Sequence, residues 1–563
     1  MLAACCLLAL GLVAARAAWV QVIEAPHLST LVIGQQRHTD PLPADRGSLL
    51  DRTGAPLALS RPAVTVGATL RFVANPGAYA EVLAPLLHVD RASLLSRLSD
   101  RTHGFVYLAR QREPGIKRRI AFALAAAHLN TGAISFVNEP KRVYPQRIAL
   151  QLLGATDPDG NGIAGAEKSL NAELQGTPGE RVVLRDRDGQ VVRVEHEQRA
   201  VPGKTVGLTI DRDIQSAAET IAAQTMERWK ANAVTIVALD PRTGGLLALA
   251  SAPGVPTGGY SKATLDEQRL RAVADGYEPG STFKVVTIGA ALQEGVVTPD
   301  TEFTVPYSLR LYDREITDAD HHGTETMTVS RILAESSNIG TVTIARSKLG
   351  EDRLASWIHK LGFGSDTGVD LPGEFSGAVL PRKKWSGTSI LSFPIGEGVL
   401  VTPLQMASLY GAIADGGVWH APHVTSSVDG VARPVRKGRR LYAPGTAHAL
   451  STMLQGVVTA TSGTGTQAAV PGFTVAGKTG TTPKLNAHGD YDGANAGYMS
   501  SFVGYLPAHD PRAVILVLVD LPPPTDTAYY GGDVAAPAFR EVAASAMQAL
   551  GVAPDDPASA SAG

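Results

Sequence analysis

An apolar run at the N-terminus constrains this chain more than any other feature of its sequence. Residues Leu2 to Ala15 are apolar without interruption, and the pattern resumes after Arg16 with Ala17, Ala18, Trp19, Val20, Val22 and Ile23. About 20 apolar residues cross the hydrocarbon core of a bilayer. Arg16 lies near the far end of the run, where a long cationic side chain can reach the interface beside an aromatic residue. The sequence therefore predicts a single transmembrane anchor over residues 1–23.

The same run leaves alternatives open. Ala15-Arg16-Ala17 loosely fits a signal-peptide cleavage site, so a cleaved signal is the alternative to an anchor. Leu2-Ala3-Ala4-Cys5 is similar to a lipoprotein cleavage box, but the apolar run follows the cysteine instead of preceding it, and we set that interpretation aside. No basic segment precedes the run, so either the true start lies upstream of Met1 or the anchor is short.

Composition excludes several classes of protein. Both cysteines, Cys5 and Cys6, lie in the apolar run, so the body of the protein has no disulfide, thiolate metal site or cysteine nucleophile. The formal net charge is −2 over 563 residues and there is no long Lys/Arg block, which argues against nucleic-acid binding. At roughly 150 residues per domain, the chain is long enough for about three or four units.

The sequence changes character near residue 204. Before it, residues 24–203 are polar, Arg-rich and irregular. Their predicted elements are strands at 105–108 and 181–184 and an amphipathic helix over 116–128. Glu167 is predicted to lie on a solvated helix face, and Arg185-Asp186-Arg187-Asp188-Gly189 to form a charged hairpin turn.

After Lys204 the helix and strand patterns are clear. A helix is predicted over 211–230 with Asp211 as its N-cap, and Pro537 suits the first turn of a last helix that runs to Leu550. The predicted strands are 233–239, 246–251, 500–506 and 513–520. Strands at both ends of a long helical middle predict an α+β domain with an antiparallel sheet. Residues 553–563 are expected to be disordered.

The segment Glu278-Pro279-Gly280-Ser281-Thr282-Phe283-Lys284 carries the first candidate catalytic pair. It leads into the apolar stretch 285–292, so a buried helix is predicted whose first turn carries Ser281. Positions i and i+3 share a helix face, which places the Lys284 amine beside the Ser281 hydroxyl. A serine hydroxyl needs a base, and a desolvated lysine near another cation can be neutral enough to serve. No other serine stands three residues before a lysine.

Two further motifs follow in order. Ser336-Ser337-Asn338 ends a helical run over 329–335 and supplies a hydroxyl and an amide, although Ser169-Leu170-Asn171 matches the same pattern. Lys478-Thr479-Gly480-Thr481 follows the strand-like residues 473–476. A cation and strand-edge N–H groups at this place could hold a carboxylate and an oxyanion.

Two patterns that suggest other ligands lack their structural context. Gly472 to Thr479 reads G-x-x-x-x-G-K-T, but a phosphate loop opens a helix after its lysine, and Gly-Thr-Thr-Pro at 480–483 prevents one. Asp318 to His322 crowds two aspartates and two histidines together, yet no second ligand group lies at metal-binding spacing, so a polar loop is predicted. We expect neither a metal nor a cofactor.

The ordered set of Ser281-x-x-Lys284, Ser336-x-Asn338 and Lys478-Thr479-Gly480 resembles the penicillin-recognising serine enzymes. Over nearly the whole chain the sequence is similar to the class B penicillin-binding proteins, most closely to their cell-division (FtsI-type) branch. The other residues that carry the resemblance are Ala15-Arg16-Ala17-Ala18-Trp19, Arg46-Gly47, Asp51-Arg52, Gly162-Ile163, Glu167-Lys168-Ser169, Tyr277 to Lys284, Val401-Thr402-Pro403-Leu404-Gln405 and Tyr529-Tyr530-Gly531-Gly532.

The resemblance implies an architecture of four parts. These are the anchor (1–23), an elongated β-rich, non-catalytic pedestal similar to a dimerisation domain (24–203), a serine transpeptidase domain with a helical subdomain (204–552) and the disordered tail (553–563). It also implies a single-pass protein of the bacterial inner membrane with a periplasmic catalytic domain. The implied partners are peptidoglycan stem peptides, β-lactams, a glycan polymerase of the FtsW type and other division proteins.

The resemblance implies the chemistry of the first two motifs as well. Ser281 would attack the D-Ala-D-Ala carbonyl of a stem peptide with Lys284 as base. Ser336 would relay a proton to the departing D-alanine, and Asn338 would hydrogen-bond the peptide amide. An amine on a neighbouring stem would resolve the acyl-enzyme, whereas β-lactams would acylate Ser281 and stay.

The third motif would supply Lys478, the last residue of the implied catalytic set, and the groups that bind the substrate. Lys478 and Thr479 would hold the terminal carboxylate of the substrate. The backbone N–H groups of Ser281 and Thr481, with Gly480 on the same strand, would hold the oxyanion.

Departures and rival interpretations accompany the resemblance. Many relatives have a glutamate where this chain has Ala164, and Gly396-Glu397-Gly398 carries a glutamate where Gln or Tyr is common. An elongation-type relative is the nearest rival, although Tyr277-Glu278 and the pair Tyr529-Tyr530 favour division. A β-lactamase or β-lactam sensor shares the three motifs, but no loop for a deacylating base is evident. The complete motif set disfavours a catalytically idle scaffold.

Overall fold

The structure is a computed structural model that describes residues 1–25, 36–186, 191–256, 258–312, 314–484, 497–523 and 529–560. The chain forms two compact units. The first comprises Met1–Gly47, Leu59–Val143 and Glu173–Lys204, and the second comprises Ser48–Ala58, Tyr144–Ala172 and Thr205–Gly563. A boundary near residue 204 coincides with the change of sequence character. Two segments of the predicted pedestal, 48–58 and 144–172, belong by their contacts to the second unit.

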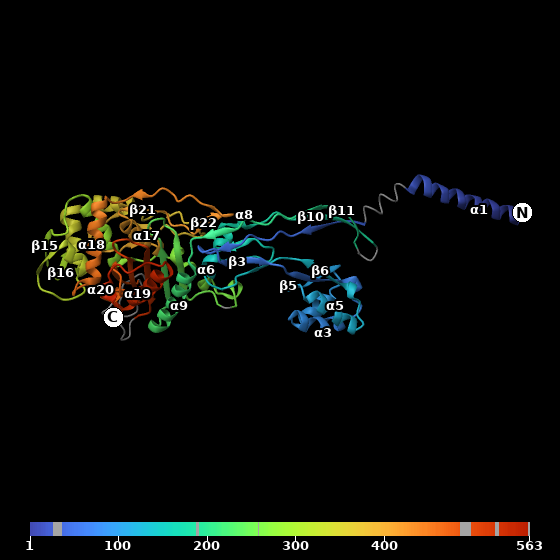
Figure 1. The fold of residues 1–563 in the computed structure, drawn as a ribbon, viewed down its shortest axis with the longest axis horizontal. Coiled ribbons are helices and arrows are strands. Elements are labelled where there is room, and N and C mark those ends of the chain that lie inside the picture. The colour runs from blue at the N-terminus through green and yellow to red at the C-terminus, as the bar shows by residue number, and fades with distance from the viewer. Residues whose placement is uncertain are drawn as a thin grey trace. The chain divides into compact units, whose positions relative to one another are not determined.

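The N-terminal apolar run is helical. Helix α1 spans Leu2–Trp19 and continues as a π-helical turn over Val20–Glu24 (Figure 1). Within the described part of the chain, Ala4–Glu24 is the one helical segment long and apolar enough to cross a membrane. Arg16 donates a hydrogen bond to the Glu24 carboxylate at 3.0 Å, so polar groups gather towards one end of the apolar segment. These features agree with a single-pass anchor.

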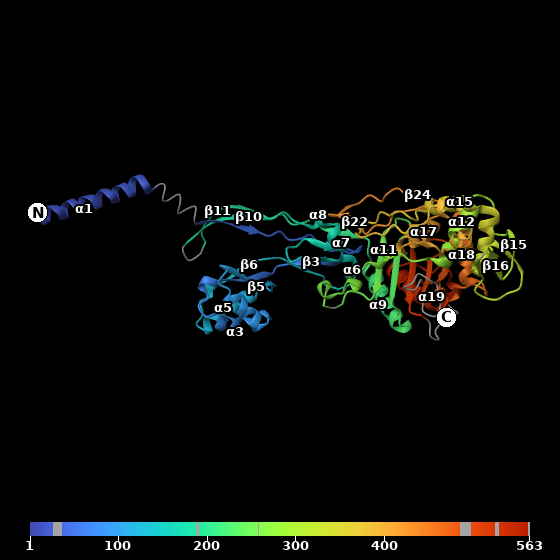
Figure 2. The ribbon, with the colours of Figure 1, turned by 180° about the vertical axis from the view of Figure 1, so that it is seen from behind.

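Apart from the N-terminal helical segment, the described residues of the first unit form two three-stranded antiparallel sheets and the helices α3, α4 and α5. The elements are β1 (Arg37–Leu42), β4 (Val64–Thr69), α3 (Pro76–Leu87), α4 (Arg91–Ser99), β5 (Phe105–Arg112), α5 (Ile116–Ala126), β6 (Ile134–Asn138), β10 (Gly179–Arg185) and β11 (Val191–Gln198). The sheets have the orders β1-β10-β11 and β5-β4-β6, and the helices lie beside the second sheet (Figure 2). Leu83, Leu94 and Ile120 from the three helices are fully buried in its core. The predicted strands at 105–108 and 181–184 and the predicted helix at 116–128 are confirmed.

Glu167 does not lie on a solvated helix face. It is part of the five-residue helix α7 (Gly165–Ser169) and is fully buried. The prediction was wrong because so short a helix shows no periodicity from which its covered side could be inferred. In the charged run, Arg185 pairs with Asp40 over 2.7 Å, and Arg187-Asp188-Gly189 of the predicted turn lie outside the described residues.

A five-stranded antiparallel sheet forms the centre of the second unit. Its strands are β13 (Ala233–Leu239), β14 (Leu246–Ala252), β25 (Ala476–Pro483), β26 (Tyr498–Leu506) and β27 (Ala513–Leu521). They are ordered β14-β13-β27-β26-β25, and every neighbouring pair is antiparallel. The predicted α+β fold is confirmed, and β25 lies at an edge of the sheet.

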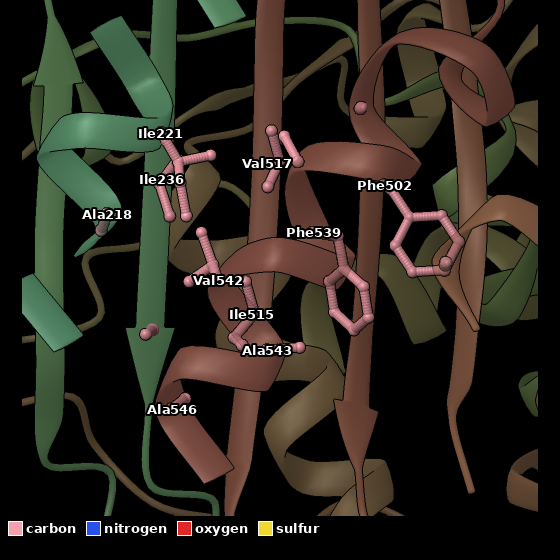
Figure 3. Packing of buried hydrophobic residues seen from close by; sticks show 14 of the residues in the cluster. Ala218, Ile221, Ile236, Phe502, Ile515, Val517, Phe539, Val542, Ala543 and Ala546 are labelled. Atoms are coloured by element: carbon pink, nitrogen blue, oxygen red, sulfur yellow. The ribbon is translucent and has the colours of Figure 1, made fainter. Parts of the chain in front are cut away.

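Helices cover both faces of this sheet. α9 (Arg212–Trp229) and α19 (Gly531–Ala549) contact one another and the strands, while α17 (Pro403–Ala414) contacts β13, β26 and β27. Figure 3 shows Phe539 of α19 beside the strands that carry Phe502 and Val517, and all three side chains are fully buried. The alternating strand residues and the helical stripe therefore meet in one core.

The starts of two helices bear on the capping predictions. Asp211 caps α9 as predicted and accepts hydrogen bonds from the backbone N–H groups of the next turn at 3.0 and 3.2 Å. α19 begins at Gly531, so the placement of Pro537 in its first turn was wrong. A Cβ on Gly531 would lie 2.3 Å from the Ser501 carbonyl oxygen, so this glycine permits the start of α19 to pack closely on the sheet.

The C-terminal residues are described as far as Ala560. A short helix, α20, spans Pro557–Ala560, and Asp555 accepts a hydrogen bond from the backbone N–H of Thr474 at 2.8 Å. Residues 553–560 thus have defined contacts where the composition predicts disorder, because a carboxylate satisfies an N–H group of the body of the domain. The last predicted tail residues, 561–563, lie outside the described residues.

Candidate active site

Ser281 lies on a tight turn that leads into a buried helix. Gly280–Phe283 form a 3₁₀ turn, and α12 (Lys284–Gln293) follows, as the motif predicts. Gly280 has a φ of +55°, and a Cβ on it would lie 2.2 Å from the Thr482 hydroxyl oxygen. Glycine alone tolerates both the left-handed conformation and this close approach. The turn that carries Ser281 is therefore pressed against the edge strand β25.

The Lys284 amine is fully buried and is held by the second motif. Its Nζ donates hydrogen bonds to Asn338 Oδ1 at 2.7 Å, to Ser336 Oγ at 3.2 Å and to the Ser336 carbonyl oxygen. Burial lowers the pKa of Lys284 to about 7, against the charges of Asp318 and Glu397, which raise it. Much of the amine is therefore neutral near pH 7 and can accept a proton.

The predicted pairing of Lys284 with Ser281 takes a different form. Ser281 lies in the 3₁₀ turn that leads into α12, and Lys284 is the first residue of α12, but among the described residues the hydrogen bonds of the amine go to Ser336 and Asn338. Ser336 sits between α13 (Val329–Ala334) and α14 (Asn338–Ile344) with a φ of 61°. This left-handed conformation is costly for a serine and typical of functional sites.

Lys478 and Thr479 bring a second buried amine to the site. Lys478 is fully buried, and burial together with the charge of Lys284 lowers its pKa well below the usual value. Its Nζ donates to the Thr479 hydroxyl at 3.1 Å, and that hydroxyl also bonds the Thr464 hydroxyl at 2.7 Å. Two buried lysines with lowered pKa values can take up either a proton or an anion.

Gly480 allows the edge strand to pass close to the turn of Ser281. A Cβ on it would lie 2.4 Å from Ser501 Oγ and 2.9 Å from a methyl group of Thr282. The strand runs on to Pro483, and no helix opens after Lys478. The phosphate-loop interpretation is therefore excluded, as the sequence context indicates.

Glu397 places a carboxylate at the edge of the site. The backbone of 396–398 runs beside the motif, because Gly280 N donates to the 396 carbonyl at 3.2 Å and Glu278 accepts from the 398 N–H at 2.8 Å. Glu397 pairs with Arg314 at 2.8 Å, and burial raises its pKa. Its charge acts on Lys284, so this departure from the family pattern bears on the base.

Known protein families match this chain over most of its length. The family described as "Penicillin binding protein transpeptidase domain" matches residues 234–544, and "Penicillin-binding Protein dimerisation domain" matches residues 41–208. The peptidoglycan D,D-transpeptidase FtsI of Escherichia coli K12 is 31% identical over 99% of this chain and 92% of FtsI. The chain belongs to the class B penicillin-binding proteins. PbpB of Mycolicibacterium smegmatis is 33% identical over 94% of this penicillin-binding protein and 86% of PbpB.

Crystal structures of such proteins share the fold. Penicillin-binding protein 3 of Mycobacterium tuberculosis, complexed with aztreonam, has a TM-score of 0.69 at 30% identity and covers 92% of this chain and 98% of its own. A peptidoglycan synthetase of Bifidobacterium adolescentis has a TM-score of 0.72 at 26% identity, with 92% and 98% covered. This penicillin-binding protein therefore has the fold of a serine-type transpeptidase.

One carboxylate of this penicillin-binding protein's site was not among the predicted site residues. Asp318 follows β17 (Arg314–Thr317) and was predicted to lie in a polar loop without a role. The structure buries it against the second motif, where it accepts a hydrogen bond from Ser337 Oγ at 2.7 Å. Its one signal in the sequence is its position directly after a strand, and that signal is too common to single it out.

Proposed function

We propose that this penicillin-binding protein is a peptidoglycan D,D-transpeptidase that cross-links the stem peptides of the septal cell wall through an acyl-enzyme on Ser281. The observation that carries the proposal is the buried Lys284 amine, whose pKa of about 7 leaves it partly neutral in a site shared with Ser336 and Asn338. Acyl transfer by a serine needs a base with a pKa near the working pH.

In the proposed first step, the Ser281 hydroxyl attacks the carbonyl carbon of the penultimate D-alanine, and Lys284 accepts its proton. The backbone N–H groups of Ser281 and Thr481 hold the oxyanion of the tetrahedral intermediate. The bond between carbonyl carbon and amide nitrogen then breaks, and Ser336, 3.2 Å from Lys284, relays the proton to the departing D-alanine amine. An ester on Ser281 remains.

Substrate recognition is assigned to the other polar groups of the site. Lys478 is a buried cation whose pKa is lowered by burial, and a carboxylate that binds beside it would raise that pKa again. We therefore propose that Lys478 and Thr479 hold the terminal carboxylate of the stem peptide. The Asn338 side chain is proposed to hydrogen-bond the peptide amide, which aligns the carbonyl with Ser281.

In the second step, an amine of a neighbouring stem peptide attacks the ester carbonyl and releases Ser281. Lys284 is proposed to take the proton of the attacking amine and to return it to the serine oxygen, which restores the free enzyme. β-Lactams are proposed to acylate the same serine, and the related protein of Mycobacterium tuberculosis has been crystallised with aztreonam and with ampicillin.

The cellular role is the finer part of the proposal. We propose an anchor in the inner membrane, a periplasmic catalytic domain and an FtsW-type polymerase among the division partners; the apolar helix Ala4–Glu24 and the similarity to FtsI support the anchor. Depletion of the protein should give filamentous cells if it acts at the septum. Round cells would assign it to elongation instead.

Mass mapping after acylation tests the chemistry. The full-length protein in detergent should form a stable adduct with labelled penicillin on Ser281, and Ser281→Ala should abolish it. Ser261→Ala, at an exposed serine of the short turn Tyr260–Lys262, is the matched control and should keep the adduct. An adduct on another residue would contradict the assignment of the nucleophile, and rapid release of the label would indicate a β-lactamase.

A further inference from the structure

Asp318 contacts the second motif through both oxygens of its carboxylate. The side chain is buried, with 6% of its residue surface exposed. Oδ1 accepts hydrogen bonds from the backbone N–H groups of Asn338 and Ile339, the latter at 3.0 Å. Oδ2 accepts from Ser337 Oγ at 2.7 Å and lies 3.0 Å from His322 Nε2. One carboxylate thus satisfies four donors, three of which belong to the turn that carries the motif.

The contacts of Asp318 also position a group that binds Lys284, the proposed base. Thr317, the residue before Asp318, makes another contact with Asn338: its carbonyl oxygen accepts a hydrogen bond from Asn338 Nδ2 at 2.9 Å. Asn338 is therefore fixed at its backbone and at its amide nitrogen, and its remaining oxygen accepts from Lys284 at 2.7 Å. With Nδ2 engaged, the amide can present only its oxygen to the lysine.

The same contacts restrain Ser336. Its φ of 61° is unfavourable for a serine and persists only where the surroundings determine it. The hydroxyl of the next residue, Ser337, donates a hydrogen bond to Asp318 and accepts one from the N–H of Gly340 at 2.9 Å. The strained residue is thus held from its C-terminal side by a buried carboxylate.

We propose that Asp318 is a positioning residue for acylation, whose carboxylate holds Ser336 and Asn338 in the arrangement that orients the Lys284 amine. The inference rests on the proposed serine acyl transfer. It goes beyond that proposal because the three motifs do not include Asp318. Asparagine cannot replace it, since an amide has one accepting oxygen where the carboxylate has two.

The charge of Asp318 has a separate effect on pH dependence. Two titratable groups face this carboxylate, His322 of its own loop and Lys284 of α12. Lys284 is also affected by the charge of Glu397, and His322 by the charge of Glu325. Asp318 raises the pKa of Lys284, so removing its charge lowers that pKa. Acylation requires the neutral amine, so its rate falls at low pH along the acidic limb of the pH–rate profile. Removing the charge of Asp318 should move this acidic limb to lower pH.

The test compares Asp318→Asn with Asp320→Asn, which removes the same charge from an exposed residue of the same loop. The second-order rate of acylation by labelled penicillin is measured from pH 5 to 9 on the full-length protein in detergent, together with the thermal midpoint. We expect D318N to acylate about 100-fold more slowly, the loss typical of a misplaced catalytic group. We also expect the acidic limb of D318N to lie at lower pH than that of the wild type. D320N should behave as the wild type does.

Three results would overturn the inference. They are a D318N rate within threefold of the wild type at every pH, an equal loss in D320N, or a loss with an unmoved acidic limb. If D318N does not fold, Ser337→Ala decides, because it removes one of the four donors and leaves the charge in place. An acylation rate of S337A about tenfold below that of the wild type, with an unmoved acidic limb, supports the inference. An S337A rate within twofold of the wild type refutes it. A wild-type protein that is not acylated would refute the proposed function instead.

Discussion

Replacing Lys284 with methionine should separate what this residue contributes to catalysis from what it costs in stability. Methionine has a similar length, no charge and a flexible side chain that fills a buried site. Lys284 is fully buried, and its pKa is about 7 instead of 10.5. Between these two pH values the unfolded chain binds more protons at this residue than the folded chain does, so stability rises with pH through that window.

The magnitude follows from the shift of the pKa. The difference of 10.5 minus about 7 is about 3.5 units, and each unit corresponds to about 1.4 kcal/mol. At pH 7, where half of the folded-state amine is neutral, the lysine therefore costs about 4 kcal/mol. Methionine removes this cost but leaves the acceptors of Ser336 and Asn338 without their donor, which costs about 1–3 kcal/mol. K284M should be more stable than the wild type at pH 7 by about 1–3 kcal/mol.

Unfolding in denaturant at several pH values checks this prediction on the full-length protein. The advantage of K284M should shrink as the pH rises from 7 to 10, because the folded-state lysine is then neutral and the unfolded-state lysine begins to lose its proton as the pH approaches 10.5. Acylation of Ser281 should fall about 10³-fold, as for loss of a general base. Lys262→Met, at an exposed lysine, should change stability by less than about 0.5 kcal/mol and leave acylation intact. A K284M protein that is less stable at pH 7, or whose difference from the wild type does not depend on pH, would refute the argument from charge burial.

Three further substitutions probe the core and the edges of the site. Phe539→Ala should lower the free energy of unfolding by about 3–5 kcal/mol, while Phe122→Ala, at a residue 79% exposed, should change it by less than about 0.5 kcal/mol in the same denaturation experiment. Gly480→Ala should slow acylation about 100-fold, because its Cβ would lie 2.4 Å from a serine hydroxyl and push the edge strand from the turn of the nucleophile; an unchanged rate would contradict this packing. Glu397→Gln should move the acidic limb of acylation to lower pH, because the Glu397 charge raises the pKa of Lys284 and its removal lowers that pKa; a limb that stays in place or moves to higher pH would argue against this coupling.

The elements of this fold that the sequence predicted well are those with local signals. The helix that starts after Asp211 has both a capping residue and a helical period. The strands near 233–239 and 513–520 have apolar runs bounded by turns. Such signals depend on neighbours along the chain, so they survive without knowledge of the tertiary structure. Pro537 and Glu167 failed because their surroundings come from elsewhere in the chain.

In the candidate site, too, the local motif was predicted from the sequence and the contacts between distant residues were not. The sequence supplied a serine three residues before a lysine, but Lys284 makes its hydrogen bonds to residues 52 and 54 positions away. Asp318 joins the second motif from 19 positions upstream of Ser337 and was missed. Contacts across such separations leave no periodic trace in the sequence.

By itself, the sequence determined the apolar anchor, the α+β class of the catalytic domain and the residue types of its three motifs. These follow from hydrophobic length, local periodicity and side-chain chemistry, all of which are properties of short segments. Only the tertiary structure decided that Lys284 and Lys478 are buried, that β25 is an edge strand beside Ser281 and that Asp318 lies under the second motif. A pKa or a hydrogen bond depends on what the folded chain places around a group, and that is settled by packing.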